Sequence, residues 1–402
     1  HPIAVAQILA DMHMDASVLA IALLHDVLED TDTTPAELEK NFGKEILNCV
    51  DGVTKLSKLR FDSREDRQSE SVRKMLLAMT SDIRVILVKL ADRIHNCRTL
   101  GGIKEPERRK RIAQETLDIY APIANRLGMG KVRSELEDLA FQYTEPEMFA
   151  DIRSQIENQR KASHDYLEKI KTIIQEKLAA DHVPARVDAR LKRAWSVYVK
   201  LKKQKIGIDQ VYDLMAFRIV TDSVRNCYAA LGIIHTNWPP IPGRIKDFIA
   251  MPRPNLYQSL HTSVMGPEGQ PFEVQIRTEE MHRIAEEGIA AHWRYKEGRK
   301  GVQQDDQRIT WLRQLVEWQK EVRDPGDFMN TLKTDLVSEE VYAFTPAGRV
   351  LILPREACPI DFAYAVHTDV GNACVGAKAN GRIVPLKYHI RNGDVIEILT
   401  QQ

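Results

Sequence analysis

The first residues with active-site chemistry lie near the N-terminus. The apolar stretch 18–24 ends in the pair His25-Asp26, and Glu29 and Asp30 follow one turn later. Residues four apart share a helix face, so His25 falls beside Glu29 and Asp26 beside Asp30. Imidazole and carboxylate groups commonly bind divalent metal ions. An isolated His-Asp pair more often caps a helix before a solvated loop, so both interpretations stay open on this segment alone.

Two further polar interruptions favour the metal site. Asp92 follows the largely apolar run 86–91, which predicts partial burial, and His1-Pro2 stands directly before the first apolar helix. Several ionisable groups on an otherwise buried helix are hard to explain by packing. A bound divalent ion makes hydroxide available near neutral pH, so the three segments together indicate a metal-dependent hydrolase.

A second chemistry is indicated further along the chain. Eight basic residues lie between Arg186 and Lys205, against the single acid Asp188, and a solvated basic helix face is the ordinary explanation. Here the run precedes Asp213, and Glu273 lies on a segment with strand-like alternation. Two carboxylates on separate strands with a basic clamp are typical of Mg²⁺-assisted transfer between phosphates. The sequence has no Walker loop, which excludes a P-loop enzyme.

The segment 243–262 is predicted to be a loop that contacts a nucleotide. Tyr257 could stack on a base, and Lys246 and His261 could meet phosphate. A buried structural tyrosine is an equally good explanation of a lone aromatic residue.

The elements that must position these residues change along the chain. Residues 1–135 show helical spacing throughout, with Thr34-Pro35 as a helix start, and predict an all-α domain. Period-two alternation predicts strands over 185–187, 216–220 and 272–277, followed by a helix over 278–296. The predicted organisation has five parts: a helical domain at 1–135, a helical connector at 136–182, a mixed α/β domain at 183–300, a linker at 301–338 and a β-rich unit at 339–402. The linker is predicted to contain a helix over 308–323. The β-rich unit is predicted to contain strands at 341–344, 349–353 and 395–399.

Composition sets the broad class. The 402 residues include 57 basic and 57 acidic side chains, so net charge does not indicate a nucleic-acid binder. No run of 18 apolar residues predicts a membrane span. Five scattered cysteines without a Cys-x-x-Cys pair exclude a disulfide framework and a cysteine zinc site, and favour a reducing cytoplasm. Because the chain starts at His1 without a signal-peptide pattern, we expect a trimmed fragment.

The N-terminal segments resemble the HD superfamily of metal phosphohydrolases. The resemblance rests on His-Asp-x-x-Glu-Asp, Leu-Ala-Asp-Arg-Ile-His-Asn and the leading His-Pro. It implies that one metal ion, usually Mn²⁺, is held by four residues: His1, His25, Asp26 and Asp92. It also implies that Glu29 and Asp30 serve the attacking water and the substrate.

Essentially the whole chain resembles the long RelA/SpoT homologue (Rel) family, which makes and hydrolyses guanosine tetra- and pentaphosphate. The motifs are Arg-x-Lys-Asp, Tyr-Gln-Ser-Leu-His-Thr, Glu-Val-Gln-Ile-Arg-Thr and Ala-Ala-His-Trp, in this order. The resemblance implies a nucleotidyltransferase-like synthetase fold, with Asp213 and Glu273 as Mg²⁺-binding and catalytic carboxylates. It implies these nucleotide-binding residues: Asn96, Arg190, Lys192, Ser196, Lys200, Arg244, Lys246, Tyr257, His261, Gln275, Arg277 and His292. This chain departs from the family pattern at Ala189, Trp195 and Leu256, where the family often has Gly, another aromatic and Gly.

The C-terminal unit resembles a TGS domain, a small β-grasp-like module, through residues 361–371. In the family this module meets uncharged tRNA on the ribosome, and His367 matches the tRNA-contacting histidine. The alternative is a polar loop histidine without a partner.

Together these features predict a bifunctional alarmone enzyme of the stringent response. Its substrates would be ATP, GDP or GTP, and ppGpp or pppGpp. The resemblance of Arg244–Asp247 to the motif of bifunctional family members implies a preference for GDP over GTP. The alternatives are a hydrolase-dominant enzyme with a weak synthetase, and a ribosome- or tRNA-binding regulator with vestigial catalysis.

Overall fold

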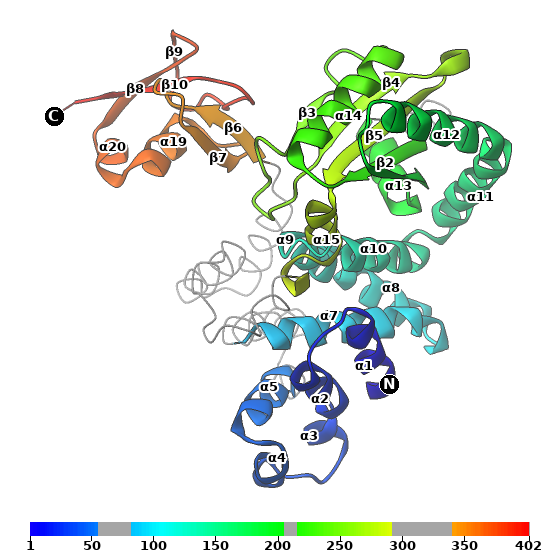
Figure 1. Cartoon of the computed structure of the whole chain (residues 1–402). Helices are drawn as coiled ribbons and strands as arrows, with labels where there is room; N and C mark the ends of the chain where they lie inside the picture. Colours follow the sequence, from blue (N-terminus) through cyan, green and yellow to red (C-terminus); the bar gives the residue numbers. More distant parts are fainter. Residues whose placement is uncertain (55–81, 205–214, 292–339, 402) are drawn as a thin grey trace. The chain divides into compact units, whose positions relative to one another are not determined.

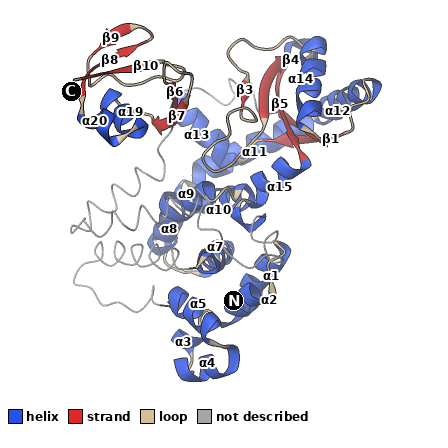
Figure 2. Cartoon of the chain, turned by 60° about the vertical axis from the view of Figure 1, so that its left-hand side comes forward, coloured by secondary structure: helices blue, strands red, loops and turns tan. Residues whose placement is uncertain are grey.

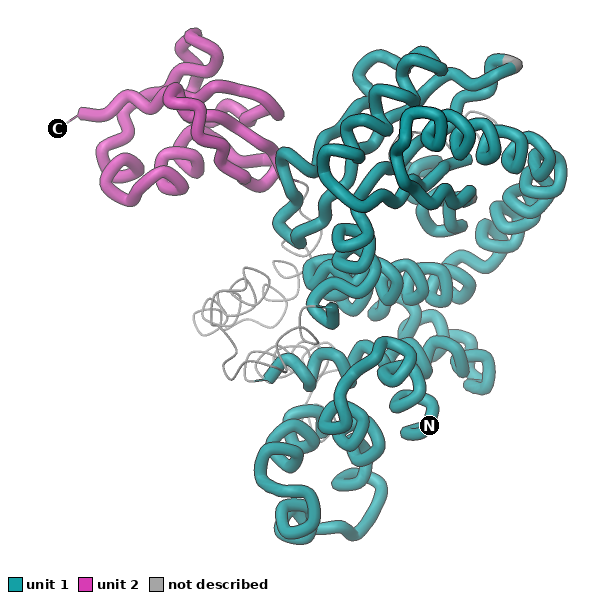
Figure 3. Tube along the Cα trace, viewed as in Figure 1, with its two compact units in different colours: residues 1–329 teal, residues 330–402 magenta. Residues whose placement is uncertain are grey.

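The computed structural model describes residues 1–54, 82–204, 215–291 and 340–401. It divides into two compact units, residues 1–329 and 330–402 (Figure 1, Figure 3). The predicted helix over 308–323 lies outside the described residues.

The first unit begins with helices alone (Figure 2). They are α1 (Pro2–Asp11), α2 (Ala16–Leu24), α3 (Val27–Asp30), α4 (Pro35–Phe42), α5 (Lys44–Thr54), α7 (Ile83–Arg98), α8 (Pro106–Glu115) and α9 (Ala121–Arg126), with a π-helical turn at Thr116–Tyr120. The predicted all-α character is confirmed for the described residues. The predicted helix start is confirmed too, because Thr34 and Glu37 form a reciprocal capping box at the start of α4.

Helix α7 is the centre of this helical part. Its buried residues occur on nearly every side of the helix, from Ile83 to Cys97, and it packs against α1, α5 and α10. A helix that is apolar all round must be buried. Asp92 lies among these apolar residues and is itself buried, at 8% exposure, so a charged group is held inside the helical core.

Three long helices lead out of the helical part: α10 (Gly130–Thr144), α11 (Pro146–Ala162) and α12 (His164–Ala180). Residue 135 lies inside α10, which packs on α7 and α8. At the other end, α12 buries Leu167, Ile170, Ile174 and Leu178 in the core of the following sheet.

A five-stranded sheet follows, with order β1-β2-β5-β4-β3. The strands are β1 (Ala185–Leu191), β2 (Met215–Thr221), β3 (Lys246–Asp247), β4 (Leu260–Met265) and β5 (Pro271–Thr278). Only β2 and β5 pair in parallel. Helices α13 (Ala194–Gln204), α14 (Val224–Asn237) and α15 (Glu279–Glu287) accompany the sheet. The core lies between α12, α14 and one sheet face.

Two predictions about these elements were wrong. Residues 246–247 and 260–262, assigned to the predicted loop 243–262, instead lie in strands β3 and β4. In β4, Leu260, Thr262 and Val264 are buried at period two. The helix predicted over 278–296 is interrupted: α15 ends at Glu287, because Gly288 adopts a left-handed φ of 59°, and residues 289–291 are helical again. Residues beyond 291 are outside the described part of the chain.

The second unit contains β6 (Glu340–Phe344), β7 (Val350–Pro354), α19 (Pro359–Val366), α20 (Thr368–Asn372), β8 (Cys374–Ala379), β9 (Arg382–Val384) and β10 (Ile396–Thr400). The predicted hairpin is the antiparallel pair β6–β7, and the predicted closing strand is β10. The sequence analysis missed the two helices and strands β8 and β9.

Two general expectations are also met. All five cysteines are free thiols. None of the described helices has both the length and the apolar composition that crossing a bilayer requires.

The fold predicts opposite effects for two Gly-to-Ala substitutions. At Gly288 a Cβ would lie 2.3 Å from the Leu127 carbonyl oxygen, with φ in the left-handed region. At Gly232, inside α14, nothing lies within 4 Å. Gly288→Ala should therefore lower the free energy of unfolding by about 2 kcal/mol or more, whereas Gly232→Ala should raise it by about 0.5–1 kcal/mol. Denaturant unfolding followed by circular dichroism measures both, and a shift in the same direction contradicts the packing described.

Candidate active sites

His25 is presented by a break between two helices. The sequence predicts a pairing of His25 with Glu29 along one helix, but α2 ends at Leu24 and α3 begins at Val27, so this prediction was wrong. The His25 ring is 1% exposed, and its Nδ1 donates to the Ala22 carbonyl oxygen at 2.7 Å. Since a carbonyl only accepts, a neutral ring leaves Nε2 as an acceptor.

That Nε2 atom is buried without a hydrogen-bond partner among the described residues. Asp26 Oδ1 lies 3.2 Å away, close enough for an ion pair, but its direction does not make a hydrogen bond. A buried acceptor without a donor is costly unless something else binds it. A metal ion would satisfy it.

The other predicted ligands gather around His25. Potential ligand atoms of His1, His25 and Asp92 all lie within 4.8 Å of one another. His1 Nε2 is 3.1 Å from Asp92 Oδ1 and 3.8 Å from Asp26 Oδ2, so Asp26 borders the group. Two imidazoles and two carboxylates are a ligand set that fits a divalent ion.

Asp92 is held as a carboxylate. Burial acts to raise its pKa, but the hydrogen bond from His1 and the charge of Lys89 hold the pKa well below its usual range. The same hydrogen bond raises the pKa of His1. Asn96 donates to Asp92 Oδ1 at 2.7 Å, so in this structure its amide positions the carboxylate. Its predicted contact with a nucleotide remains a prediction, as do the roles of Glu29, which is partly buried, and Asp30, which is exposed.

The second candidate site lies on the sheet face opposite the apolar core. Because paired residues share a face, the register places Asp188, Arg218, Gln275, His261 and Lys246 in one row across five strands. Arg190 and Glu273 lie in the neighbouring row, both paired with Ala216. The sheet therefore collects charged residues from segments up to 85 positions apart, between Asp188 and Glu273.

Glu273 is the centre of a polar cluster. Its carboxylate accepts from Gln275 Nε2 at 2.9 Å and lies 3.4 Å from Lys192 Nζ and 3.6 Å from His261 Nδ1. Partial burial of His261 lowers its pKa to about 4 despite the charge of Glu273, so the ring is neutral near pH 7. The Tyr257 hydroxyl lies 2.7 Å from His261 Nε2. Asp213, the predicted partner of Glu273, lies outside the described residues.

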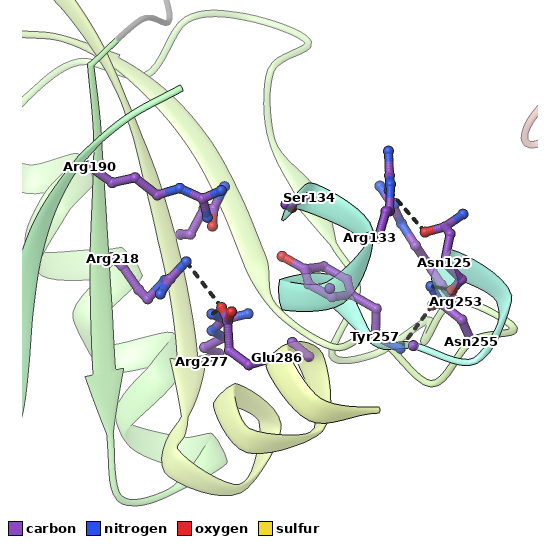
Figure 4. A pocket seen from close by; sticks show the side chains of 14 residues that line it. Asn125, Arg133, Ser134, Arg190, Arg218, Arg253, Asn255, Tyr257, Arg277 and Glu286 are labelled. Atoms are coloured by element: carbon purple, nitrogen blue, oxygen red, sulfur yellow. Dashed lines mark hydrogen bonds and ion pairs between the residues drawn. The ribbon is translucent and has the colours of Figure 1, made fainter. Parts of the chain in front are cut away.

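Beside this cluster is a pocket rich in arginine (Figure 4). Arg190, Arg218 and Arg277 come from β1, β2 and β5, and Arg253 and Tyr257 from the loop before β4. Among the described residues that line the pocket, Glu286 of α15 is the only carboxylate. It accepts from Arg277 Nη2 at 3.0 Å and lies 3.3 Å from Arg218 Nη2.

The pocket has an electrostatic preference for anions. Burial and the neighbouring arginines lower the pKa of Arg190 and of Arg218. The Nε atoms of Arg218 and Arg277 are buried without a hydrogen-bond partner among the described residues. One carboxylate does not balance this positive charge, so the pocket suits a polyanion with several acceptor oxygens.

The predicted nucleotide-binding residues fall into three groups. Four line the pocket: Arg190, Tyr257, Gln275 and Arg277. A second group lies toward Glu273: Lys192, Lys246 and His261. The third group lies elsewhere, with Ser196 and Lys200 on α13 and Arg244 exposed before β3. His292 is outside the described residues.

Several pocket residues were missed by the sequence analysis, notably Arg218, Arg253 and Glu286. Arg218 had a usable signal, since it is the one charged residue in the apolar strand 215–221. Leu256, noted as a departure from glycine, has a left-handed φ of 62°. That conformation costs little for glycine and more for leucine, so the position suits the glycine that the family resemblance led us to expect.

His367 lies in the second unit and serves as the N-cap of α20. Its Nδ1 accepts from the Asp369 amide at 3.2 Å, and its side chain is 67% exposed. It therefore has a local capping role in the fold, and it keeps an accessible ring. Its contact with tRNA remains a prediction.

Comparison with known proteins gives three matches in chain order. Residues 1–130 match the HD domain, residues 189–300 the region found in RelA/SpoT proteins, and residues 341–400 the TGS domain. These matches define a multidomain protein that carries an HD domain, a RelA/SpoT region and a TGS domain in this order. The whole chain is 53% identical to a GTP pyrophosphokinase of Myxococcus xanthus and 47% identical to a probable GTP pyrophosphokinase of Mycobacterium leprae and a GTP pyrophosphokinase of Streptomyces coelicolor.

The chain belongs to the long RelA/SpoT homologue family. It spans about half the length of these curated relatives: 53%, 52% and 49%.

The arginine pocket predicts a pH-dependent contribution from Glu286. Burial acts to raise its pKa, but Arg218 and Arg277 hold the pKa below its ordinary value of 4.5. The carboxylate thus stabilises the fold above that value, and the stabilisation is lost as pH falls through the lower, folded pKa. Glu286→Gln should reduce the free energy of unfolding by about 1–3 kcal/mol at pH 7. In denaturant titrations the difference from wild type should shrink toward pH 3; a difference independent of pH contradicts an ionised Glu286.

Proposed function

We propose that this chain is a bifunctional alarmone enzyme. The observation that carries the proposal is the presence of two chemically different sites in one unit. One gathers His1, His25 and Asp92 around an unsatisfied imidazole nitrogen. The other combines an arginine pocket with Glu273 and its polar neighbours. The family membership and the names of the relatives support assigning these sites to hydrolysis and synthesis of (p)ppGpp.

The synthetase reaction moves a pyrophosphoryl group from ATP to GDP or GTP. The ribose 3′-oxygen of the acceptor forms a bond to the β-phosphorus of ATP, the bond from that phosphorus to the α–β bridging oxygen breaks, and AMP leaves. Glu273 would accept the proton of the 3′-hydroxyl, since its carboxylate is partly buried and held by Gln275 and Lys192. The pocket arginines would hold the phosphates. Mg²⁺ bound by Asp213 and Glu273 would neutralise phosphate charge.

The hydrolase reaction adds water to the 3′-pyrophosphate of ppGpp, giving GDP and pyrophosphate. His1, His25, Asp26 and Asp92 would hold Mn²⁺, which makes water more acidic near neutral pH. Asn96 fixes the orientation of Asp92, and Glu29 and Asp30 would contact water and substrate.

The TGS match supports a further role in binding uncharged tRNA on the ribosome, with exposed His367 as the contact.

The two activities should be separable by substitution. We expect Asp26→Ala to abolish hydrolysis of ppGpp with Mn²⁺ while synthesis continues, because loss of one ligand typically impairs binding of the ion and Asp26 lies far along the chain from Glu273. Release of pyrophosphate from ppGpp, with and without a chelator, measures the first activity. Hydrolysis near the wild-type rate would show that Asp26 is not a ligand.

The complementary substitution is Glu273→Gln. The two side chains have nearly the same shape, so the fold should persist. Loss of the carboxylate removes metal binding and base function, and general-base effects alone amount to roughly 10²–10⁴-fold. AMP release from ATP and GDP should fall by at least this factor while ppGpp hydrolysis is retained. Synthesis within a few-fold of wild type would assign the reaction to another carboxylate.

The two activities should also be coupled, because running both consumes ATP without net product. Helix α10 lines the arginine pocket and packs on α7, which carries Asp92. A nucleotide that prefers one arrangement of these helices would shift the balance, and a coupling of about 1–3 kcal/mol suffices. We expect a non-hydrolysable ATP analogue to slow ppGpp hydrolysis, and the effect to vanish in the Arg190→Ala/Lys192→Ala variant. A rate indifferent to saturating analogue excludes the coupling in this chain.

A further inference from the structure

We infer that Arg133 of helix α10 binds the acceptor guanine nucleotide of the synthetase. The inference rests on the proposed synthetase function. It extends the nucleotide site beyond the sheet to the helical part of the unit that carries the His25 cluster. No motif in the sequence assigned a role to Arg133.

The position of Arg133 is the first argument. Arg133 and Ser134 line the same pocket as Tyr257, although they come from α10 (Figure 4). The close approach of α15 makes this possible, since a Cβ on Gly130 would lie 2.4 Å from the Ala285 carbonyl oxygen. The Ile289 amide also donates to the Leu127 carbonyl oxygen at 3.0 Å. The start of α10 is therefore a fixed wall of the pocket.

The guanidinium of Arg133 is held in place with one donor nitrogen left over. Its Nε donates to Glu137 at 2.8 Å and its Nη1 to Asn125 Oδ1 at 2.9 Å. In the part of the chain that the structure describes, no side chain accepts from Nη2. The side chain is 41% exposed, so a ligand in the pocket can reach it. An oriented guanidinium with a remaining donor is well suited to a phosphate oxygen.

The same residue that holds Arg133 also anchors Tyr257. The Asn125 carbonyl oxygen accepts from Asn255 Nδ2 at 3.0 Å, and Asn255 Oδ1 accepts from the Tyr257 amide at 3.2 Å. Asn125 thus links the helix and the loop, and it fixes the arginine relative to the aromatic ring. Such a preformed arrangement reduces the entropy cost of binding.

The surroundings of Tyr257 indicate which nucleotide Arg133 meets. Tyr257 is the one aromatic residue among the described residues that line the pocket, so it is where a base would stack. Its hydroxyl contacts His261, which faces Glu273, so a nucleotide stacked on Tyr257 lies next to the proposed base. Figure 4 shows Arg133 on the Tyr257 side and Arg190, Arg218 and Arg277 on the other. Arg133 is therefore assigned to the acceptor and the other three arginines to ATP.

The test measures binding of GDP and of a non-hydrolysable ATP analogue to the whole chain by calorimetry. Arg133→Gln removes the charge while keeping a donor for Asn125. We expect it to weaken GDP binding about tenfold, the usual effect of one charge-assisted hydrogen bond, and to leave binding of the analogue within twofold. Salt should weaken GDP binding less in the variant than in wild type. Lys131→Gln, an exposed charge on the same helix outside the pocket lining, is the matched control and should bind both like wild type.

Unchanged GDP binding by Arg133→Gln overturns the inference, and so does an equal loss for both nucleotides. If Arg133→Gln lowers the melting midpoint, the Arg133→Lys variant decides, because it restores the charge without the planar guanidinium. GDP binding by Arg133→Lys that is stronger than by Arg133→Gln supports the inference, whereas an equal loss of GDP binding overturns it. Failure of wild type to bind GDP is a different result, since it would reject the proposed synthetase function itself.

Discussion

The sheet of the first unit can bury only one face, and the second site follows from this constraint. Helices α12 and α14 cover the face that carries Val187, Phe217, Val274 and Ile276. Alternation along each strand then forces the intervening residues to the opposite face, where the register brings Arg218, Gln275 and His261 into one row. The apolar core thus selects which charged residues meet. Slipping any strand by one residue would exchange the two sets and destroy both core and site.

A second constraint is the tight docking of α15 against the turn before α10. Gly130 and Gly288 remove the Cβ atoms that would collide with backbone there. Backbones in such contact leave little room for independent movement. The helical part of the unit therefore forms one wall of the arginine pocket, and a nucleotide in that pocket touches elements that also pack on α7. This physical continuity gives the proposed coupling between the two reactions a route through packed helices.

The two sites solve opposite electrostatic problems within a chain of zero net charge. Around His25 a small group of imidazoles and carboxylates offers lone pairs to a cation, and Asp92 is kept ionised by His1 and Lys89. In the pocket, five arginines surround Glu286, the one carboxylate among the described lining residues, and their guanidinium groups offer donors to an anion. The overall composition, with equal numbers of acidic and basic residues, does not reveal either local charge. The sign of the charge at each site depends on where the ionisable side chains lie, how deeply they are buried and which partners they contact.

Local patterns in the sequence were enough for the fold class and for the residue types at both sites. Alternation located β2 and β5, the Thr34 capping box located α4, and the motifs led to His25, Asp92, Glu273 and Tyr257. These signals are readable because they depend on neighbours within a few residues. Reliance on such local patterns also led to wrong predictions at two helix ends. Gly288 ends α15 through its backbone angle, and the helix is interrupted between α2 and α3 beside His25.

The tertiary structure alone decided which distant residues share a site. Arg133, Arg253 and Glu286 carry no common motif and enter one pocket because strand register and the docking of α15 bring their segments together. It also decided which atoms lack partners, such as His25 Nε2. A sequence specifies the chemical type of a side chain and its spacing along the chain. The distances between side chains, their burial and the directions of their hydrogen bonds are set only when remote segments pack together. Those three quantities determine what the group can bind.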